Sequence, residues 1–460
     1  MQHVNLKPMA IKYNFKKSNQ KTISDKYISE PIQRFLTNST MSGLLLFGSA
    51  FIAIVLANSP WGESYYYFWE NRVSIGFGDH MLSKTLHHWI NDGLMAIFFF
   101  VVGLELKREI IAGELRTFKN AVVPLVAAVG GMIIPAAIFL GFNHDPEFAK
   151  GWGVPMATDI AFALGIVYLL GDKVPLSLKV FLTALAIVDD IGAVLVIAIF
   201  YTSDLNFISL GVGFVILAIM IGANYIGIRN TVFYGILGIG GLWLAFLMSG
   251  VHATIAAVLA AFAIPAGVKV NESEYTEGIG DLLGKFKEED KNDVKTLTPQ
   301  QLYIIQDIRK FSKKALTPLQ NLEYAMHPLV AFLIMPIFAL ANAGVTIKAD
   351  ALNNLNHPVF LGVFFGLVVG KLLGVFGLVK LGIYFKWFSL PEGMTNRHLL
   401  ACGFLAAIGF TMSLFIIELA FTNKELAVIA KMAVLCATIL SSIVAYILLL
   451  TGRKSTNQNE

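Results

Sequence analysis

The chain contains few charged residues for its length. Only 14% of its 460 residues are Asp, Glu, Lys or Arg, whereas 56% are hydrophobic. Soluble domains carry about 25% charged and about 45–50% apolar residues, so this composition excludes an ordinary soluble protein. The formal net charge of +4 identifies no partner by itself, because in a membrane protein the location of the charges matters more than their sum.

Other common features are also scarce. The two cysteines, Cys402 and Cys436, lie within apolar runs and are interpreted as small core residues, not as a disulfide or metal pair. The chain has no GxxxxGKS/T loop, which argues against an ATP-driven pump. The first 34 residues are polar and lysine-rich and lack the apolar stretch of a cleavable signal peptide, so we expect them in the cytoplasm. We expect no cofactor and no nucleic-acid partner.

What the chain does contain is a series of long apolar runs. Each is close to the roughly 20 residues that a helix needs to cross a bilayer. The least distinct boundary separates the seventh run from the eighth, near Gly250. The sequence therefore predicts an all-α membrane protein with twelve transmembrane helices, at 41–58, 88–106, 120–142, 152–171, 177–202, 207–226, 231–249, 251–268, 327–346, 357–383, 397–420 and 427–450.

The distribution of lysine and arginine predicts the orientation of these helices. With the N-terminus inside, 28 of the 35 Lys and Arg fall in cytoplasmic segments, 6 fall in external segments and one, Lys371, falls within a span. This asymmetry follows the positive-inside rule. The sequence thus predicts a multi-pass membrane protein with both termini in the cytoplasm.

Two polar segments interrupt the apolar runs. The external segment 59–85 is rich in aromatic residues and is expected to contain a hairpin. In the charged cytoplasmic loop 269–326, Thr298-Pro299 and the helical spacing of later apolar residues predict a short amphipathic helix. The predicted organisation is an N-terminal extension (1–40), a first membrane part (41–268), the cytoplasmic loop (269–326), a second membrane part (327–450) and a cytoplasmic tail (451–460).

Acidic residues in the middle of the spans are the most informative feature. Asp189 and Asp190 are adjacent within the fifth span, although a carboxylate there costs about 2.5–3.5 kcal/mol on insertion scales. Asp159 in the fourth span reaches a similar depth, because the two helices are antiparallel and joined by a short loop. Lys371 lies at a comparable depth in the tenth span. A structural ion pair would explain one aspartate and Lys371 but not the surplus acids, so the sequence predicts an ion or proton site.

The residues around Asp159 predict a broken helix. In the segment GWGVPMATDIAFALG, Gly153 and Pro155 cannot continue a regular helix, and Thr158-Asp159 follows directly. The eleventh span has a matching irregularity over residues 406–413, with Gly409 at its centre. Such breaks are tolerated where they line a cavity or are buried in protein. Because spans three to five and ten to twelve start on opposite sides, they are predicted to be inverted repeats whose broken helices cross near mid-membrane.

This arrangement of carboxylates predicts a competition between cations and protons. Carboxylate and carbonyl oxygens suit hard cations such as Na⁺ and Li⁺. Burial and mutual repulsion favour the protonated acid, so protons and Na⁺ compete for one site. Exchange of Na⁺ for protons is the leading interpretation. Two alternatives are a sodium-coupled symporter of an organic anion and an intramembrane aspartyl protease, although the protease motifs Tyr-Asp and Gly-x-Gly-Asp do not surround Asp159 or Asp189.

The remaining polar candidates lie at predicted helix ends. Glu105 and Glu109 are at the inner end of span two, and Glu323 and His327 at the inner start of span nine. His252 is at the outer start of span eight. Taken alone, each is interpreted as a solvated helix end, although histidine titrates near physiological pH and suits pH sensing.

Several long motifs occur in order along the chain. They are HHWINDGLMAIFFFVVGLELKRE, GGMIIPA, ATDIAFALG, LTALAIVDDIGA, SGVHAT, HPLVAFLIMPIFALANAGV, GKLLG and LPEG…GFTMSLFI. Together they resemble the NhaA family of bacterial sodium/proton antiporters, over about residues 35–455 apart from the loop at 270–320. The resemblance implies that Asp190 and Asp189 are the ion and proton carboxylates. It also implies that Asp159 and Thr158 lie in the crossing broken helices and that Lys371 is the partner of Asp189.

The same resemblance implies regulation by pH. It implies electrogenic exchange of about two protons per Na⁺, transport of Li⁺ as well as Na⁺, and a homodimer in membrane lipid that the outer hairpin helps to hold. Two departures leave the pH set-point open: an N-terminal extension of about 35 residues and the enlarged loop before span nine. The implied pH-responsive residues are Glu105, Glu109, Glu323 and His327 as a cytoplasmic cluster, with His252 as a secondary pH-linked residue.

Overall fold

The computed structural model describes residues 39–451 apart from 78–79, 203–204, 290–295 and 347–354. The predicted C-terminal tail and nearly all of the predicted N-terminal extension lie outside the described residues. The described chain is helical except for one two-stranded sheet and the connecting segments. The predicted all-α class of a polytopic membrane protein is therefore confirmed.

Twelve helical units among the described residues correspond to the predicted spans, although one of them, Ala253–Ala263, is shorter than the roughly 20 residues that a crossing needs. Nine helical segments among the described residues are apolar and at least 18 residues long. Two shorter apolar segments, Thr231–Leu247 and Ala253–Ala263, and the partly charged helix α5 (Met95–Ala112) complete the set. The nine are α2 (Ser39–Ala57), α6 (Phe118–Phe142), α9 (Leu176–Phe200), α10 (Phe207–Ile226), α22 (Lys424–Leu450) and four composite spans at Pro146–Leu169, Pro318–Asn342, Pro358–Tyr384 and Asn396–Ala420.

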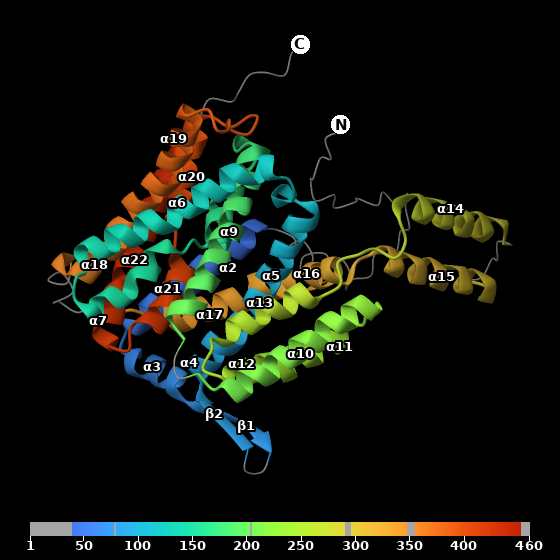
Figure 1. The fold of residues 1–460 in the computed structure, drawn as a ribbon, viewed down its shortest axis with the longest axis horizontal. Coiled ribbons are helices and arrows are strands. Elements are labelled where there is room, and N and C mark those ends of the chain that lie inside the picture. The colour runs from blue at the N-terminus through green and yellow to red at the C-terminus, as the bar shows by residue number, and fades with distance from the viewer. Residues whose placement is uncertain (1–38, 78–79, 203–204, 290–295, 347–354, 452–460) are drawn as a thin grey trace.

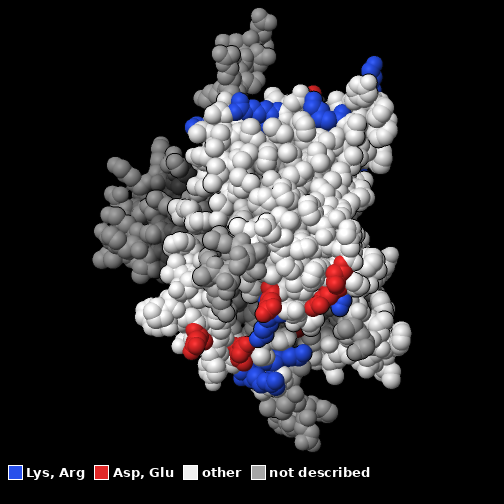
Figure 2. Space-filling model, turned by 90° about the vertical axis from the view of Figure 1, so that its left-hand side faces the viewer, with Lys and Arg blue, Asp and Glu red and all other residues white. Residues whose placement is uncertain are grey.

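The surface of the bundle is divided by charge. Figure 2 shows a broad uncharged surface between one end that carries Lys and Arg and another that carries charges of both signs. A charged side chain is costly in the hydrocarbon core of a bilayer. The uncharged zone is therefore the surface that lipid can cover, and the charged ends are suited to the aqueous phases.

The segment between α2 and α5 folds as the predicted hairpin. Strand β1 (Arg72–Phe77) pairs with β2 (His80–Thr85) in antiparallel register, and the two strands project from one end of the bundle (Figure 1). A short helix, α3 (Gly62–Glu70), precedes them. The hydroxyl of Tyr65 in this helix donates a hydrogen bond to the carbonyl of Leu340, 2.6 Å away. This bond ties the hairpin segment to the membrane bundle.

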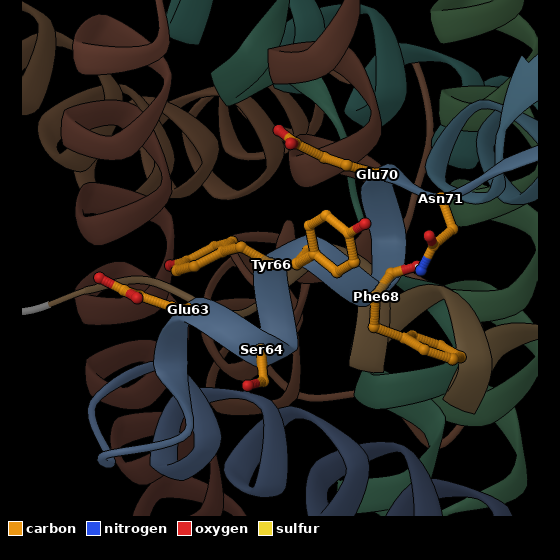
Figure 3. A pocket seen from close by; sticks show the side chains of 7 residues that line it. Glu63, Ser64, Tyr66, Phe68, Glu70 and Asn71 are labelled. Atoms are coloured by element: carbon orange, nitrogen blue, oxygen red, sulfur yellow. The ribbon is translucent and has the colours of Figure 1, made fainter.

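A hollow in the molecular surface lies beside α3 (Figure 3). All of its lining residues belong to this helix or to the residue that follows it. None of the acidic residues predicted for the ion site is among them, so the hollow is not the candidate functional site. The lining residues are Glu63, Ser64, Tyr66, Tyr67, Phe68, Glu70 and Asn71.

The large polar loop forms two helices where the sequence predicted one. The expected amphipathic helix is α15 (Pro299–Ala315), and Thr298 caps it through a reciprocal pair of hydrogen bonds with Gln301. The second helix, α14 (Glu272–Glu288), was not predicted, because three glycines within it lower its helix propensity. A capping box that starts at Asn271 and packing against α15 offset this cost.

Glycine permits close contact where α6 meets the tenth span. Gly374 lies in a π-helical turn (Leu373–Gly377), and a Cβ atom there would overlap the backbone carbonyl of Gly130 in α6. A Cβ atom at Gly377 in the same turn would meet open space. The two glycines thus differ in packing although they share a local conformation.

We expect Gly374→Ala to lower the free energy of unfolding by about 1–3 kcal/mol, the usual cost of overpacking, because the α6 backbone has to move. Gly377→Ala is the matched control and is expected to change stability by no more than about 0.5 kcal/mol. Thermal unfolding of both purified variants in detergent measures the difference. Equal stability of the two variants would show that this contact does not limit the packing.

Candidate functional site

The candidate site is built where two spans are interrupted. The fourth span consists of a 3₁₀ segment (Lys150–Met156) and α8 (Ile160–Leu169), with extended backbone between them. The eleventh span consists of α20 (Asn396–Ala406) and α21 (Phe410–Ala420). The backbone N–H of Asp159 donates to the carbonyl of Ile408 at 2.7 Å, so the two interruptions touch. The predicted breaks in spans four and eleven are therefore confirmed.

Asp159 joins the starts of two half-helices. Its Oδ1 accepts a 2.9 Å hydrogen bond from the backbone N–H of Phe162 and so caps α8. Its Oδ2 accepts from the backbone N–H of Thr411 at 3.0 Å and from the Thr411 hydroxyl, at the start of α21. Helix N-termini carry partial positive charge, which favours an anion there. The buried Asp159 carboxylate is therefore stabilised by two helix ends that point toward it.

Asp189 lies on α9 and is paired with Lys371 of the tenth span. The Lys371 ammonium contacts Asp189 Oδ2 directly and donates to the Thr158 hydroxyl at 2.9 Å. The same hydroxyl lies 2.5 Å from Asp189 Oδ2 and 2.9 Å from the carbonyl of Ala406. Lys371 is 0% exposed and Asp189 2% exposed. Thr158 therefore links the broken spans to the ion pair.

Asp190 has no such partner. It is 2% exposed, yet it forms no hydrogen bond or ion pair with any residue that the structure describes. The charges near it are those of Asp189, Asp159 and Glu105, which repel a carboxylate, and that of Lys371, which attracts it. One of two adjacent aspartates is thus held by a lysine, whereas the other is available to a proton or a cation.

The three aspartates do not form a compact metal centre. Within the described part of the chain, no group of three or more His, Cys, Asp or Glu is placed to hold one metal ion. Asp159 is engaged with α21, Asp189 with Lys371, and Asp190 with neither.

A second group of charges gathers around Arg108 of α5. Its guanidinium lies 2.9 Å from Glu323 on α16 (Pro318–Leu329) and 2.8 Å from Glu109. The charge of Glu105 also acts on Arg108, and His327 lies one turn along α16 from Glu323. The structure thus brings together the predicted cluster of Glu105, Glu109, Glu323 and His327.

His252 lies apart from this cluster. It precedes α13 (Ala253–Ala263), its Nδ1 is 2.9 Å from the Thr254 hydroxyl, and its ring packs edge-on against Phe415 of α21. Its Nε2 is 3.9 Å from a carboxylate oxygen of Asp92. His252 is therefore adjacent to the helix that carries Thr411, and its local charge partner is Asp92.

Three of these polar residues were not predicted as site residues: Thr411, Arg108 and Asp92. Thr411 lies in the segment where the break in span eleven was predicted, and that signal could have pointed to it. Arg108 and Asp92 lie within the motif HHWINDGLMAIFFFVVGLELKRE. Their roles depend on partners from other spans, and no local pattern predicts those contacts.

Crossing broken helices over buried carboxylates, inside a bundle of twelve spans, define a secondary transporter of small cations. The sequence profile described as Na⁺/H⁺ antiporter 1 matches residues 33–449. The chain therefore belongs to the Na⁺/H⁺ antiporter 1 family, and it is a transporter rather than an enzyme. This assignment excludes the intramembrane protease and the organic-anion symporter as alternatives.

The chain is also similar to curated relatives over nearly its whole length. It is 50% identical to the Na⁺/H⁺ antiporter NhaA of Oleidesulfovibrio alaskensis, over 94% of this chain and 96% of the relative. It is 46% identical to Na⁺/H⁺ antiporter NhaA 1 of Saccharophagus degradans, over 93% of each chain. For the Na⁺/H⁺ antiporter NhaA of Wolinella succinogenes the identity is 45%, over 90% of this chain and 91% of the relative.

We expect Thr411→Val to weaken Na⁺-dependent exchange, because Asp159 loses a hydroxyl donor while the side-chain shape is retained. A hydrogen bond to a charged group contributes about 1.5–3 kcal/mol, which corresponds to at least a tenfold rise in the Na⁺ concentration for half-maximal exchange. Thr438→Val is the matched control, because the hydroxyl of Thr438 is buried and has no hydrogen-bond partner. Equal behaviour of the two variants would exclude a role for Thr411 in the site.

Proposed function

We propose that the protein exports Na⁺ or Li⁺ in exchange for external protons and that Asp190 binds the cation. The contrast between the two adjacent aspartates supports this proposal. Asp189 is held by Lys371 and Thr158, whereas Asp190 is buried without a hydrogen-bond or ion-pair partner in the part of the chain that the structure describes. A buried anion without a counter-charge is strongly disfavoured. Asp190 therefore takes either a proton or a cation, and release of one is coupled to binding of the other.

Asp189 acts as the switchable partner of Lys371 in this proposal. When a cation binds at Asp190, a second positive charge comes close to Asp189 and competes with the ammonium of Lys371. Asp189 then shares its charge between the cation and the lysine. Two coupled groups that titrate at one site are consistent with electrogenic exchange of about two protons per Na⁺.

Alternating access would follow from movement at the crossing of the broken spans. Thr158 contacts both Asp189 and Ala406, so it joins α9 to the eleventh span. Asp159 joins the two half-helices α8 and α21. Rocking of these half-helices changes the oxygen atoms that surround Asp190, as in transporters whose inverted repeats move against each other.

We assign the protein to the bacterial inner membrane with both termini in the cytoplasm, because 28 of its 35 Lys and Arg lie in segments on that side. This orientation lets an existing proton gradient drive Na⁺ out and so maintain cytoplasmic pH and low sodium. We expect a homodimer in lipid, in which β1 and β2 pair with a second copy, because exposed strand edges readily pair.

Regulation by pH is assigned to the charges around Arg108. Arg108 connects α5 and α16 through Glu109 and Glu323, with Glu105 and His327 close by. A change in the charge of Glu105 or His327 would alter the attraction that holds the two helices together. His252 is a secondary pH-linked residue, because it lies beside Asp92 and α21.

Transport by Asp190→Asn and Asp189→Asn tests the two assignments. We expect Asp190→Asn to abolish exchange, because an amide cannot take up the proton or balance the cation. We expect Asp189→Asn to retain transport with fewer protons per Na⁺, because its partner role is lost while Asp190 remains. Dye-based collapse of a proton gradient in inverted vesicles, with and without a membrane potential, measures both. Full activity of Asp190→Asn would contradict the proposal.

Deletion of 272–296 tests the link between the polar loop and pH. We expect the pH profile of exchange to shift without loss of maximal activity, because the loop continues through α15 into α16, which carries Glu323. Exchange rates measured from about pH 6.5, where an unperturbed histidine titrates, up to about pH 9 report the shift. An unchanged profile would show that the loop does not influence the charges around Arg108.

A further inference from the structure

The two-helix unit formed by α14 and α15 projects from the side of the transmembrane bundle (Figure 1). Its two helices pack on each other, and an aromatic contact lies between them. The rings of Tyr275 and Phe311 are stacked with centroids 5.8 Å apart, and the Tyr275 hydroxyl lies 2.9 Å from that of Ser312. Phe311 also fills the space beside Gly278. This contact determines which face of α15 is turned toward α14.

The opposite face of α15 is apolar and exposed. One side of the helix carries residues that repeat at helical spacing, at positions 302, 305, 309 and 313. Position 316 follows just beyond the helix. Three of the five are large apolar residues with much of their surface exposed: Leu302 at 48%, Ile305 at 39% and Leu316 at 52%. The other two are Arg309 and Lys313. Apolar residues interleaved with basic ones are typical of a helix that lies in a membrane interface.

The two helices carry opposite charge. The sequence of α14 contains five acidic and two basic residues, whereas that of α15 contains one acidic and four basic residues. The single acid of α15, Asp307, lies 3.7 Å from Lys310. Among the described residues, Arg309, Lys313 and Lys314 form no ion pair. An anionic surface would therefore attract α15 and repel α14.

The connection to the bundle keeps α15 close to the membrane surface. Only Leu316 and Thr317 separate the end of α15 from Pro318, the first residue of a membrane-length apolar segment. Lys313 and Lys314 therefore lie within about two helical turns of a membrane span. Basic residues beside a span are attracted to anionic headgroups within a Debye length.

We infer that α15 docks on the anionic lipid of the leaflet next to which it emerges, with Leu302 and Ile305 inserted among the headgroups and Arg309 and Lys313 on lipid phosphates. The acidic α14 covers its other face toward water. The identity of the leaflet rests on the proposed function, which places this loop in the cytoplasm. It needs no assumption about the ion site.

A fluorescent label on the docking face tests the inference. In full-length protein with Cys402→Ala and Cys436→Ser, Gln306→Cys places the label beside the apolar face of α15, and Thr276→Cys places it on the exposed side of α14 as the matched control. The protein is reconstituted in vesicles of phosphatidylcholine alone or of phosphatidylcholine with phosphatidylglycerol. Quenching by nitroxide-labelled lipid reports insertion, and quenching by iodide reports exposure to water.

In vesicles that contain phosphatidylglycerol we expect severalfold stronger lipid quenching at position 306 than at 276, with a blue-shifted emission. High salt is expected to reduce this difference, because it screens the headgroup attraction. Arg309→Gln with Lys313→Gln is expected to remove the dependence on phosphatidylglycerol, whereas Lys285→Gln with Lys287→Gln on α14 is expected to leave it unchanged.

Three results would overturn the docking. The first is equal iodide quenching at both positions in both lipids. The second is protection at 306 that is the same in neutral vesicles, which would indicate cover by protein. The third is loss of docking in the variant with Lys285→Gln and Lys287→Gln but not in the variant with Arg309→Gln and Lys313→Gln. Na⁺-dependent collapse of a proton gradient is measured in the same vesicles, so a docked label without exchange would count against the proposed transport function only.

Discussion

Compensation of buried charge is the constraint on which the centre of this molecule depends. Lys371 and Asp189 are both removed from water and contact each other, so neither can be lost without leaving an unpaired charge in a medium that solvates it poorly. Three spans are held in register by this requirement, because Thr158 shares its hydroxyl with the pair. Asp190, the next residue of α9, has no such partner among the described residues, and the proposed cation site rests on this difference between the two aspartates.

The interrupted helices extend the same constraint to the backbone. An unbroken helix satisfies its own N–H and C=O groups and offers nothing to a neighbour. The breaks free the N–H groups at the starts of α8 and α21, and the carboxylate of Asp159 accepts from both. The cost of interrupting two membrane helices is thus offset by contacts between them.

At the ends of the bundle, the polar elements are arranged by the charges that they carry. The Arg108 group ties α5 to α16 through charges near a helix end. The loop that leads into α16 carries opposite charge on its two helices, so it has a preferred orientation beside an anionic surface. Through a lipid contact of α15, the composition of the membrane would act on the same segment of chain that carries pH-linked charges in α16. The ion site itself lies elsewhere and is built from other spans.

The sequence by itself determined the membrane class, the twelve spans, the breaks near Pro155 and Gly409, and the common depth of the acidic residues. These follow from local properties: apolar length, backbone restrictions and helix rise. The common depth did not specify which aspartate contacts Lys371, because adjacent residues on a helix point in different directions. The family resemblance implied Asp189, and the tertiary structure places Asp189 in contact with Lys371. Only the tertiary structure decided the contact between Thr411 and Asp159 and the pairing of α14 with α15, since each depends on residues far apart in the chain.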